Sequence, residues 1–253
     1  MKTAITYLSD PQPVSMGDDW YDIANADHFW IRRRFDIFRK LSRYKYEPGQ
    51  SIAEVGCGHG LVQKQFETQF GSFVDGIDLN ESALNNSVAR DHPLYYYDVN
   101  ERQDAFRHRY DQVILFDVVE HVSDPVGFLE SVKYMVKPNG LIAINVPALQ
   151  SLFSGYDLMA GHHRRYNVKT FSELIGASGL RIQILSYWGA TLVPILAIRK
   201  LLFMIQPKNE ATYRRGFSSG IKMSNEMLFQ WSRLEKIPQR LIGSSLMAIV
   251  SSE

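Results

Sequence analysis

Ser51-Ile-Ala-Glu-Val-Gly-Cys-Gly-His-Gly60 is the stretch of sequence that decides the fold. Its first half is a short apolar run, which predicts a buried strand, and its second half carries a glycine at every other position. The residues that follow place Val62, Phe66 and Phe70 on one helical stripe. A strand, a glycine turn and a helix in this order present backbone N–H groups and a helix N-terminus to a nucleotide-like ligand. The sequence therefore predicts an α/β protein with a ligand-binding turn.

The spacing of the glycines narrows the choice of ligand. A dinucleotide-binding fingerprint reads Gly-x-Gly-x-x-Gly, whereas here the third glycine comes one residue early and Leu61 stands in the last position. A phosphate-binding P-loop would end in Gly-Lys-Ser or Gly-Lys-Thr, which is absent. A nicotinamide-dependent oxidoreductase is therefore disfavoured, although it stays open as an alternative.

Further apolar runs follow the glycine turn, and acidic residues end two of them. Asp78 lies about 20 residues past the turn, where a carboxylate can accept hydrogen bonds from ribose hydroxyls, and Asp98 ends the next run. The strands are expected at residues 52–55, 73–78, 94–98, 110–116, 141–145, 180–187 and 244–251, and helices between them at 81–89, 125–136 and 170–178. We predict a doubly wound, Rossmann-like α/β sheet of seven strands with the last strand antiparallel.

The row Glu54-Val-Gly-Cys-Gly-His-Gly60, together with these landmarks, resembles class I S-adenosylmethionine-dependent methyltransferases. The resemblance extends to the ubiquinone-pathway O-methyltransferases and the methyltransferase type 11 and 12 group, and it covers residues 54–145. It implies S-adenosylmethionine as the cofactor, with S-adenosylhomocysteine as its product, and assigns the adenine ring to Asp98 and Val99. The residues that it assigns to the cofactor in this part of the chain are Glu54, Gly56, Gly58, Gly60, Asp78, Leu79, Asp98, Val99 and Phe116.

The N-terminal residues 1–46 are expected to form an arm and a cofactor-covering helix. Residues 1–19 are polar and contain Pro11 and Pro13, so a loosely held arm is predicted. A helix is expected from about residue 27 to 46. Similar methyltransferases open with an aromatic-plus-arginine segment that closes over the cofactor, which adds Trp30 and Arg34 to the cofactor set. Alternatively, Trp30 anchors this helix to the core.

One face of the same helix is strongly basic. It carries Arg32, Arg33, Arg34, Arg39, Lys40, Arg43 and Lys45. A solvated face is the favoured interpretation, and contact with an anionic surface or a phosphate-bearing substrate is the alternative.

Two segments carry the chemistry that methyl transfer to oxygen needs, a base and groups that position the acceptor. In Asp117-Val-Val-Glu-His121, a helical turn would place the acids and His121 on one face. This stretch is similar to an active-site motif of the ubiquinone-pathway enzymes that is associated with a divalent cation, so a metal is possible here but is not expected. In Gly161-His-His-Arg-Arg-Tyr166, His162 and His163 could act as a base or bind the acceptor. Of the three histidines, His121 and His163 are the choices for proton removal or acceptor placement. The structural alternative for this second segment is a pair between Arg165 and a carboxylate.

The region 189–242 departs from a minimal methyltransferase sheet. Its apolar run is interrupted by Arg199 and Lys200 after ten residues, too short to span a bilayer. It could be a lid, a dimer contact, an extra helical layer, or a helix in a membrane interface through residues 189–206. The expected organisation is an N-terminal segment (1–46), a core (47–188), a helical insertion (189–242) and the final strand (243–253).

Composition excludes several function classes. The formal net charge of +1 argues against general nucleic-acid binding, and residues 117–120 lack the Pro-Pro-aromatic run of nucleic-acid N-methyltransferases. A single cysteine, Cys57, excludes an intrachain disulfide and a cysteine metal cluster.

No apolar signal segment opens the chain, so a cytoplasmic location is expected, with peripheral contact at the inner membrane face as an alternative. The expected activity is methylation of a small-molecule or lipid-linked acceptor at oxygen, and the other candidate is a non-catalytic regulator that binds the cofactor.

Overall fold

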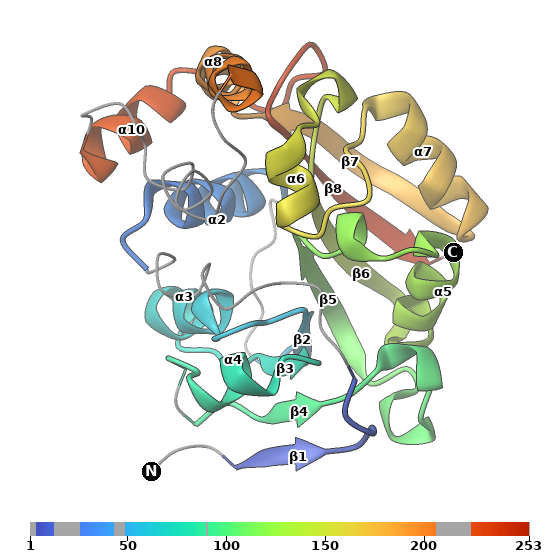
Figure 1. The fold of residues 1–253 in the computed structure, drawn as a ribbon. Helices are drawn as coiled ribbons and strands as arrows, with labels where there is room; N and C mark the ends of the chain where they lie inside the picture. The colour runs from blue at the N-terminus through green and yellow to red at the C-terminus, as the bar shows by residue number, and fades with distance from the viewer. Residues whose placement is uncertain (1–3, 13–25, 43–48, 90, 206–223, 253) are drawn as a thin grey trace.

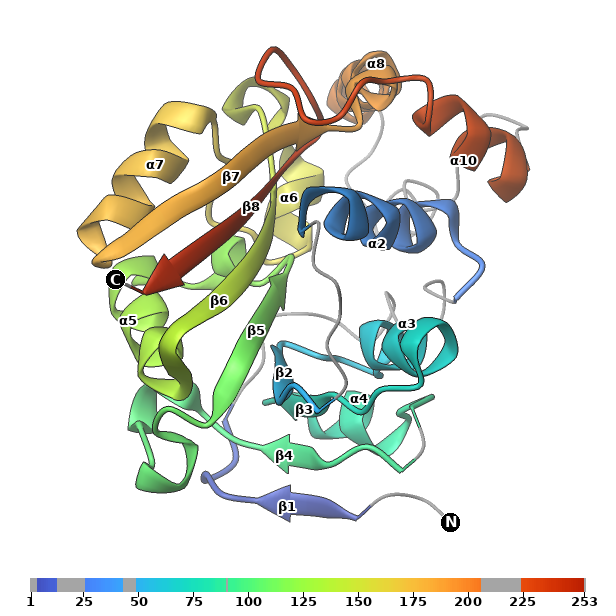
Figure 2. The ribbon, with the colours of Figure 1, turned by 180° about the vertical axis from the view of Figure 1, so that it is seen from behind.

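The computed structural model describes residues 4–12, 26–42, 49–89, 91–205 and 224–252. At its centre lies an eight-stranded sheet with helices on both faces (Figures 1 and 2). The strands are β1 (Ile5–Tyr7), β2 (Ile52–Val55), β3 (Asp75–Asp78), β4 (Leu94–Tyr96), β5 (Tyr110–Phe116), β6 (Val136–Pro147), β7 (Leu180–Trp188) and β8 (Ser245–Ser252). Their order across the sheet is β1-β4-β3-β2-β5-β6-β8-β7.

All neighbouring strands pair in parallel except β8, which is antiparallel to both β6 and β7. This confirms the predicted doubly wound sheet with an antiparallel last strand. Because the parallel strands share one direction, their carboxyl ends meet at one edge of the sheet, which is where such folds bind ligands.

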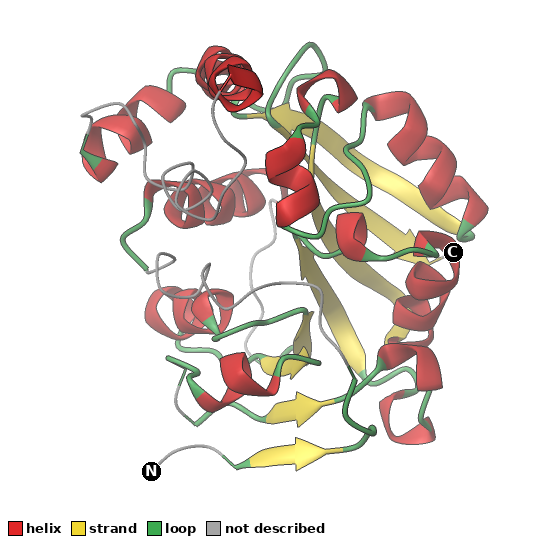
Figure 3. Cartoon of the chain, viewed as in Figure 1, coloured by secondary structure: helices red, strands yellow, loops and turns green. Residues whose placement is uncertain are grey.

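Helices cover the sheet on two sides (Figure 3). They are α2 (Phe29–Ser42), α3 (Leu61–Phe70), α4 (Glu81–Asn85), α5 (Pro125–Met135), α6 (Gly155–Met159), α7 (Val168–Ala177), α8 (Val193–Ile205) and α10 (Asn225–Ser232), with short 3-10 turns η1 (Val99–Glu101), η3 (Val119–His121), η4 (Gln150–Leu152) and η5 (Ala190–Leu192) among the connections. Side chains alternate along β5, so Val113 and Leu115 join the apolar cluster under α5 and α7, whereas Ile114 and Phe116 join the one under α2 and α3.

The N-terminal arm contains an eighth strand that the sequence does not predict. Residues 5–7 pair in parallel with β4, with Ile5 opposite Leu94, and the Tyr7 ring stacks on Tyr96 at a centroid distance of 5.7 Å. The prediction of a loose arm is therefore wrong for these residues, and the seven-stranded sheet is extended by one strand. A three-residue strand shows no readable alternation, and it is held by partners about 90 residues away in the chain. Residues 1–3 and 13–19 lie outside the described residues.

The basic face of α2 is not uniformly solvated, so the favoured interpretation is wrong for two of its arginines. Arg33 is fully buried and donates to Glu235 at 3.1 Å, and the largely buried Arg34 donates to Asp117 at 2.7 Å. Burial of a guanidinium is tolerated when a carboxylate faces it. Arg33 also pairs with Asp36, three residues on, at 2.6 Å. Glu235 and Asp117 come from distant parts of the chain, so no local pattern could reveal these two. Arg43 and Lys45 lie outside the described residues.

The described residues between β7 and β8 are 189–205 and 224–244. Helix α8, helix α10 and the loop that leads from α10 into β8 lie along the top of the molecule as drawn in both views (Figures 1 and 2). Within the described ranges, none of the helices combines the length and the apolar character needed to cross a bilayer.

Candidate active site

The glycine turn lies where β2 ends and α3 begins. Gly56, Gly58 and Gly60 all have positive φ, at 78°, 52° and 81°, which side chains with a Cβ adopt only with strain. A Cβ on Gly56 would also collide with the side chain of Val118. No side chain caps the helix at Gly60. The positive φ values and the close approach of Val118 thus explain why glycines stand at these positions, and the role of the turn in binding a ligand stays a prediction.

Asp78 lies at the end of β3, directly beside the glycine turn. Its Oδ2 accepts the backbone N–H of Gly58 at 2.6 Å and its Oδ1 accepts that of Asn80 at 2.8 Å. Burial raises the pKa of this carboxyl, and the backbone hydrogen bonds oppose that shift. The neighbouring Leu79 is half-buried and packs against the small apolar cluster under Cys57. Asp78 thus faces the turn, which is where a ribose-binding acid has to lie.

Glu54 is buried on β2, two residues before Gly56, the first glycine of the turn. Its Oε2 has no hydrogen-bond partner among the described residues. Burial raises the pKa of this carboxyl well above its ordinary value, and the nearby Arg34 opposes the shift. A buried carboxyl oxygen without a partner is costly, so this atom marks a place that suits a hydrogen-bond donor or a cation.

Asp98 lies past the end of β4 and is held from two sides. Its Oδ1 accepts from the backbone N–H of Asn100 at 2.9 Å, and its Oδ2 accepts from the side-chain amide of Gln12 at 3.1 Å. The backbone N–H of Asp98 donates to the Ser9 hydroxyl. Val99 is buried in the main core cluster. The sequence analysis missed Gln12, which comes from the segment just after the unexpected strand β1.

Removing the Gln12 side chain tests whether Asp98 needs this support. Gln12→Ala should weaken binding of S-adenosylhomocysteine by about 0.5–1.5 kcal/mol, since one hydrogen bond to a charged group is lost. Isothermal titration measures the affinity. The matched control is Gln183→Ala, which removes an exposed amide that bonds only Ser251 on the far edge of the sheet. Equal affinities for the wild type and Gln12→Ala would remove Gln12 from the site.

Asp117 begins the segment after β5 and does not lie where the sequence predicts. Its φ of 59° is left-handed, and a 3-10 turn over residues 119–121 follows, so Asp117 does not share one α-helical face with the other two residues. Instead its Oδ1 accepts from Asn145 at 2.6 Å and its Oδ2 accepts from Arg34. The expectation of a single helical turn is therefore wrong. The positive φ, which few residues other than glycine adopt, is held by these two bonds.

The same network ties the predicted cofactor-covering helix to the sheet. Asn145 accepts a hydrogen bond from the Trp188 indole N–H at 2.8 Å, and the Trp30 ring packs on Trp188 at a centroid distance of 4.5 Å. The guanidinium of Arg34 lies 5.0 Å from the centre of the Phe116 ring. Trp30 thus anchors α2 to the core, while Arg34 lies near Glu54 at the turn. The sequence did not predict a role for Asn145 and Trp188. Their role depends on contacts with Asp117 and Trp30, which lie far away in the chain.

Glu120, His121 and His162 form a compact polar cluster. One ligand atom from each lies within 4.8 Å of the others, and the two imidazole rings meet edge to face with centroids 4.7 Å apart. Neither nitrogen of His121 nor either oxygen of Glu120 has a hydrogen-bond partner among the described residues. Burial lowers the pKa of His121 to about 4, with His162 adding to the effect, and burial raises the pKa of Glu120 well above its ordinary value.

The loop that carries His162 is fastened by a buried carboxylate. Asp157 accepts from Arg165 at 2.7 Å and bonds the His162 ring at 3.1 Å, and it closes a capping box with Ser154 at the start of α6. These partners lower the pKa of Asp157 to about 2 against the effect of its burial. Arg165 thus pairs with a carboxylate, as the structural interpretation of this segment holds. His163 differs from its neighbour, because it is exposed and only its backbone N–H reaches Glu120.

Three donor atoms at this spacing could hold a cation, although the expectation that no metal is needed stays a prediction. Two imidazoles and one carboxylate are a chemically suitable set for Zn²⁺, but a closed site needs four ligands. Asp117 does not belong to the cluster.

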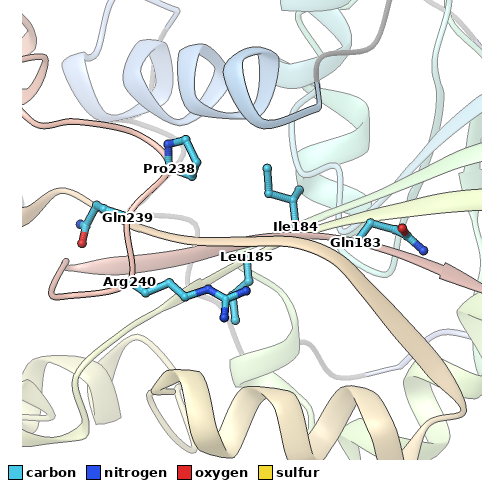
Figure 4. A pocket seen from close by; sticks show the side chains of 6 residues that line it. All are labelled: Gln183, Ile184, Leu185, Pro238, Gln239 and Arg240. Carbon is cyan, nitrogen blue, oxygen red and sulfur yellow. The ribbon is translucent and has the colours of Figure 1, made fainter.

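A hollow of about 270 Å³ lies elsewhere, between the outer strand β7 and the loop that precedes β8 (Figure 4). Its lining is Gln183, Ile184, Leu185, Pro238, Gln239 and Arg240. The guanidinium of Arg240 extends back along β7 toward Leu185. Since it holds no carboxylate or histidine and lies at the edge strand, we do not assign chemistry to it.

A family model for a methyltransferase domain matches residues 14–184, which is more than half of the chain. The chain belongs to this methyltransferase-domain family. Among individual relatives, the ubiquinone biosynthesis O-methyltransferase of Neisseria meningitidis serogroup C is 30% identical over 102 residues, which cover 37% of this chain and 42% of that protein. The protein of the same name from Paraburkholderia phytofirmans is 30% identical over 145 residues, 53% of this chain and 62% of that one. The chain thus matches less than two thirds of the length of these relatives.

Solved structures of methyltransferases share the fold. Phosphoethanolamine N-methyltransferase 2 of Haemonchus contortus, solved in complex with S-adenosyl-L-methionine, superposes with a TM-score of 0.59 at 18% identity and covers 90% of this chain and 56% of that one. A methyltransferase from Archaeoglobus fulgidus gives a TM-score of 0.52 at 16% identity over 94% of this chain and 95% of that one. The methyltransferase-domain family therefore accounts for both the sequence match and the sheet.

Proposed function

We propose that the chain is an S-adenosylmethionine-dependent methyltransferase. The observation that carries this proposal is the meeting of the glycine turn, the Asp78 carboxylate and the unpartnered Glu54 oxygen at the ends of β2 and β3. A carboxylate has about four lone-pair positions. The backbone N–H groups of Gly58 and Asn80 occupy one position on each oxygen of Asp78, and the Leu79 N–H makes a third hydrogen bond, which leaves about one position for a ribose hydroxyl.

The other residues of the pocket fit the remaining parts of the cofactor. Glu54 offers its buried oxygen to an ammonium group, which would satisfy the unpaired carboxyl. Asp98 and Val99 would border the adenine ring, and Arg34 and Phe116 would close the opposite end. When bound, the cofactor supplies a methyl group that is already activated on a sulfonium. The protein's own task is to align the acceptor, exclude water and remove a proton.

His121 is our candidate for proton removal. With its pKa lowered to about 4, the imidazole is neutral at physiological pH, so a ring nitrogen can accept the hydroxyl proton of an acceptor. His162, which is bonded to Asp157, would hold His121 in place through the edge-to-face contact. A catalytic role for His163 stays a proposal that its exposed position does not favour.

The low pKa of His121 bears on the choice of acceptor. A weak base removes a proton more readily from a phenol, with a pKa of about 10, than from an aliphatic alcohol, whose hydroxyl is far less acidic. We therefore favour a phenolic or quinol-like acceptor, methylated at oxygen, over a sugar carried on a lipid phosphate. The relatives named for ubiquinone biosynthesis support the same chemistry.

Turnover with cofactor that carries an isotopically labelled methyl group tests the proposal. Incubation with cell extract should transfer the label to a phenolic metabolite that gains one CH₂ unit by mass spectrometry. The control is the same extract with heat-inactivated protein. If S-adenosylhomocysteine binds but no metabolite gains label, the chain is a regulator and not an enzyme. If NAD binds in its place, the methyltransferase assignment fails.

A further inference from the structure

Two helices outside the active site leave apolar side chains in contact with solvent. On α8, Ile198, Leu201 and Met204 recur every three residues and are 56%, 62% and 72% exposed. On α10, Met227 and Trp231 are 56% and 47% exposed, and Leu234, two residues past the end of the helix, is 71% exposed. Residues three or four apart share a helix face, so each helix presents an apolar stripe outward.

The loop between α10 and β8 continues this apolar surface. Leu241 is 90% exposed, and its neighbour Ile242 is also exposed. Because α8, α10 and this loop all lie along the top of the molecule in both views, we name the exposed apolar residues of these three segments the apolar edge (Figures 1 and 2). Helices α8 and α10 both pack against η5, so these segments are neighbours. Exposed apolar side chains on neighbouring segments mark an interaction surface more often than scattered ones do.

The charge beside the apolar edge is positive. Arg233 and Lys236 are exposed, and no described residue forms an ion pair with either. The two acids of the same segment are already engaged, because Glu226 pairs with Arg32 at 2.8 Å and Glu235 pairs with Arg33. The charge left for an outside partner is therefore cationic.

We propose that the apolar edge docks on the surface of an anionic lipid bilayer. Exposed aliphatic side chains next to free cations are the combination that holds a helix in the interface of such a membrane. Trp231 suits the boundary, because its ring is exposed while its indole N–H donates to the backbone of Thr191. Helix α8 has 13 residues and is about 20 Å long, so it lies on the surface and does not span.

A second copy of the chain fits this surface less well. In a two-fold dimer the same patch faces itself, so the exposed cations Arg233 and Lys236 of one copy would meet a surface of the same positive charge on the other. An anionic headgroup layer compensates these charges directly.

Docking in this way would also bring the active site to the membrane. Lys200 of α8 donates to the backbone of Ser151 at 2.6 Å, and Arg199 lies 4.1 Å above the Tyr156 ring. Both partners belong to the segment 147–166, which also carries His162. This consequence, access to a membrane-borne acceptor, rests on the proposed function, whereas the docking does not.

Flotation with vesicles tests the docking. The wild type should float with vesicles of phosphatidylcholine and phosphatidylglycerol and stay largely unbound with phosphatidylcholine alone. Leu201→Glu and Leu234→Glu should each lower the bound fraction about tenfold or more, because an aliphatic side chain that would enter the membrane interface is replaced by a charge that the headgroups repel. The matched control is Phe73→Glu, which changes an equally exposed residue ahead of β3 and should bind as the wild type does.

Three results would overturn the docking. They are a wild type that stays unbound with both vesicle types, patch variants that bind as well as Phe73→Glu, and a lipid-free dimer in sedimentation that Leu201→Glu dissociates. Affinity for S-adenosylhomocysteine, measured without vesicles, separates this proposal from the methyltransferase assignment. Patch variants should retain that affinity, which also shows that they are folded.

Discussion

Replacing His121 by alanine lowers kcat by about 10²–10⁴-fold if this imidazole removes the acceptor proton, which is the range that general-base catalysis contributes. Neither ring nitrogen has a hydrogen-bond partner among the described residues, so the side chain is not needed to satisfy a buried group. The affinity for the cofactor should stay unchanged, because His121 lies in the cluster with Glu120 and His162 and not at the glycine turn. Initial rates at saturating cofactor and acceptor measure the effect.

The pH dependence gives an independent check on His121. Its pKa is lowered to about 4, so the ring stays neutral and competent until the pH falls toward that value. The kcat/KM, which reports the free enzyme, is therefore expected to be flat from about pH 8 to about pH 5, whereas a base with an ordinary imidazole pKa would lose activity below about pH 6.5. His108→Ala, an exposed histidine bonded to the backbone of Val136, is the matched control. A kcat/KM that falls with a midpoint near pH 6.5, or a His121→Ala enzyme as fast as the control, would remove His121 from the mechanism.

Asp78→Ala should weaken cofactor binding by about 1–3 kcal/mol through the loss of charge-assisted hydrogen bonds. The same carboxylate accepts the Gly58 N–H, so the substitution also frees the glycine turn. Asp78→Asn separates the two effects, because an amide oxygen can still accept from the turn but carries no charge. Isothermal titration with S-adenosylhomocysteine gives the affinities.

Two further measurements complete the Asp78 prediction. Asp104→Ala removes an exposed carboxylate that accepts only from the Tyr134 hydroxyl, and it should bind the cofactor as the wild type does. Thermal unfolding of each variant shows whether a lost affinity reflects a lost fold. An unchanged dissociation constant for Asp78→Ala would refute the assignment of Asp78 to the ribose.

The parts of the fold that could be read from the sequence are those with a local signal. The run from Ile52 to Gly60 marks a strand and a turn, and the alternation on β5 separates the two faces of the sheet. Strand β1 could not be read, because three residues gain their stability from Tyr96 and Glu81 far along the chain. The same holds for the second partner of the buried Arg33, because Asp36 lies three residues on but Glu235 lies about 200 residues away.

The parts of the site that the sequence predicts are those where a residue type is required by its own position in the chain. Glycines with positive φ and an acid at the end of β3 follow from spacing alone. The chain from Arg34 through Asp117 and Asn145 to Trp188 was not predicted, because each member acts through another. The 3-10 turn at residues 119–121 was not predicted either, because over three residues the sequence pattern of a 3-10 turn does not differ from that of an α-helical turn.

Titration of the wild-type protein with S-adenosylhomocysteine and, in parallel, with NAD tests the central assignment most directly. The glycine turn and Asp78 predict saturable binding of S-adenosylhomocysteine at one site per chain and no measurable heat with NAD. Binding of NAD with no response to S-adenosylhomocysteine would contradict the account.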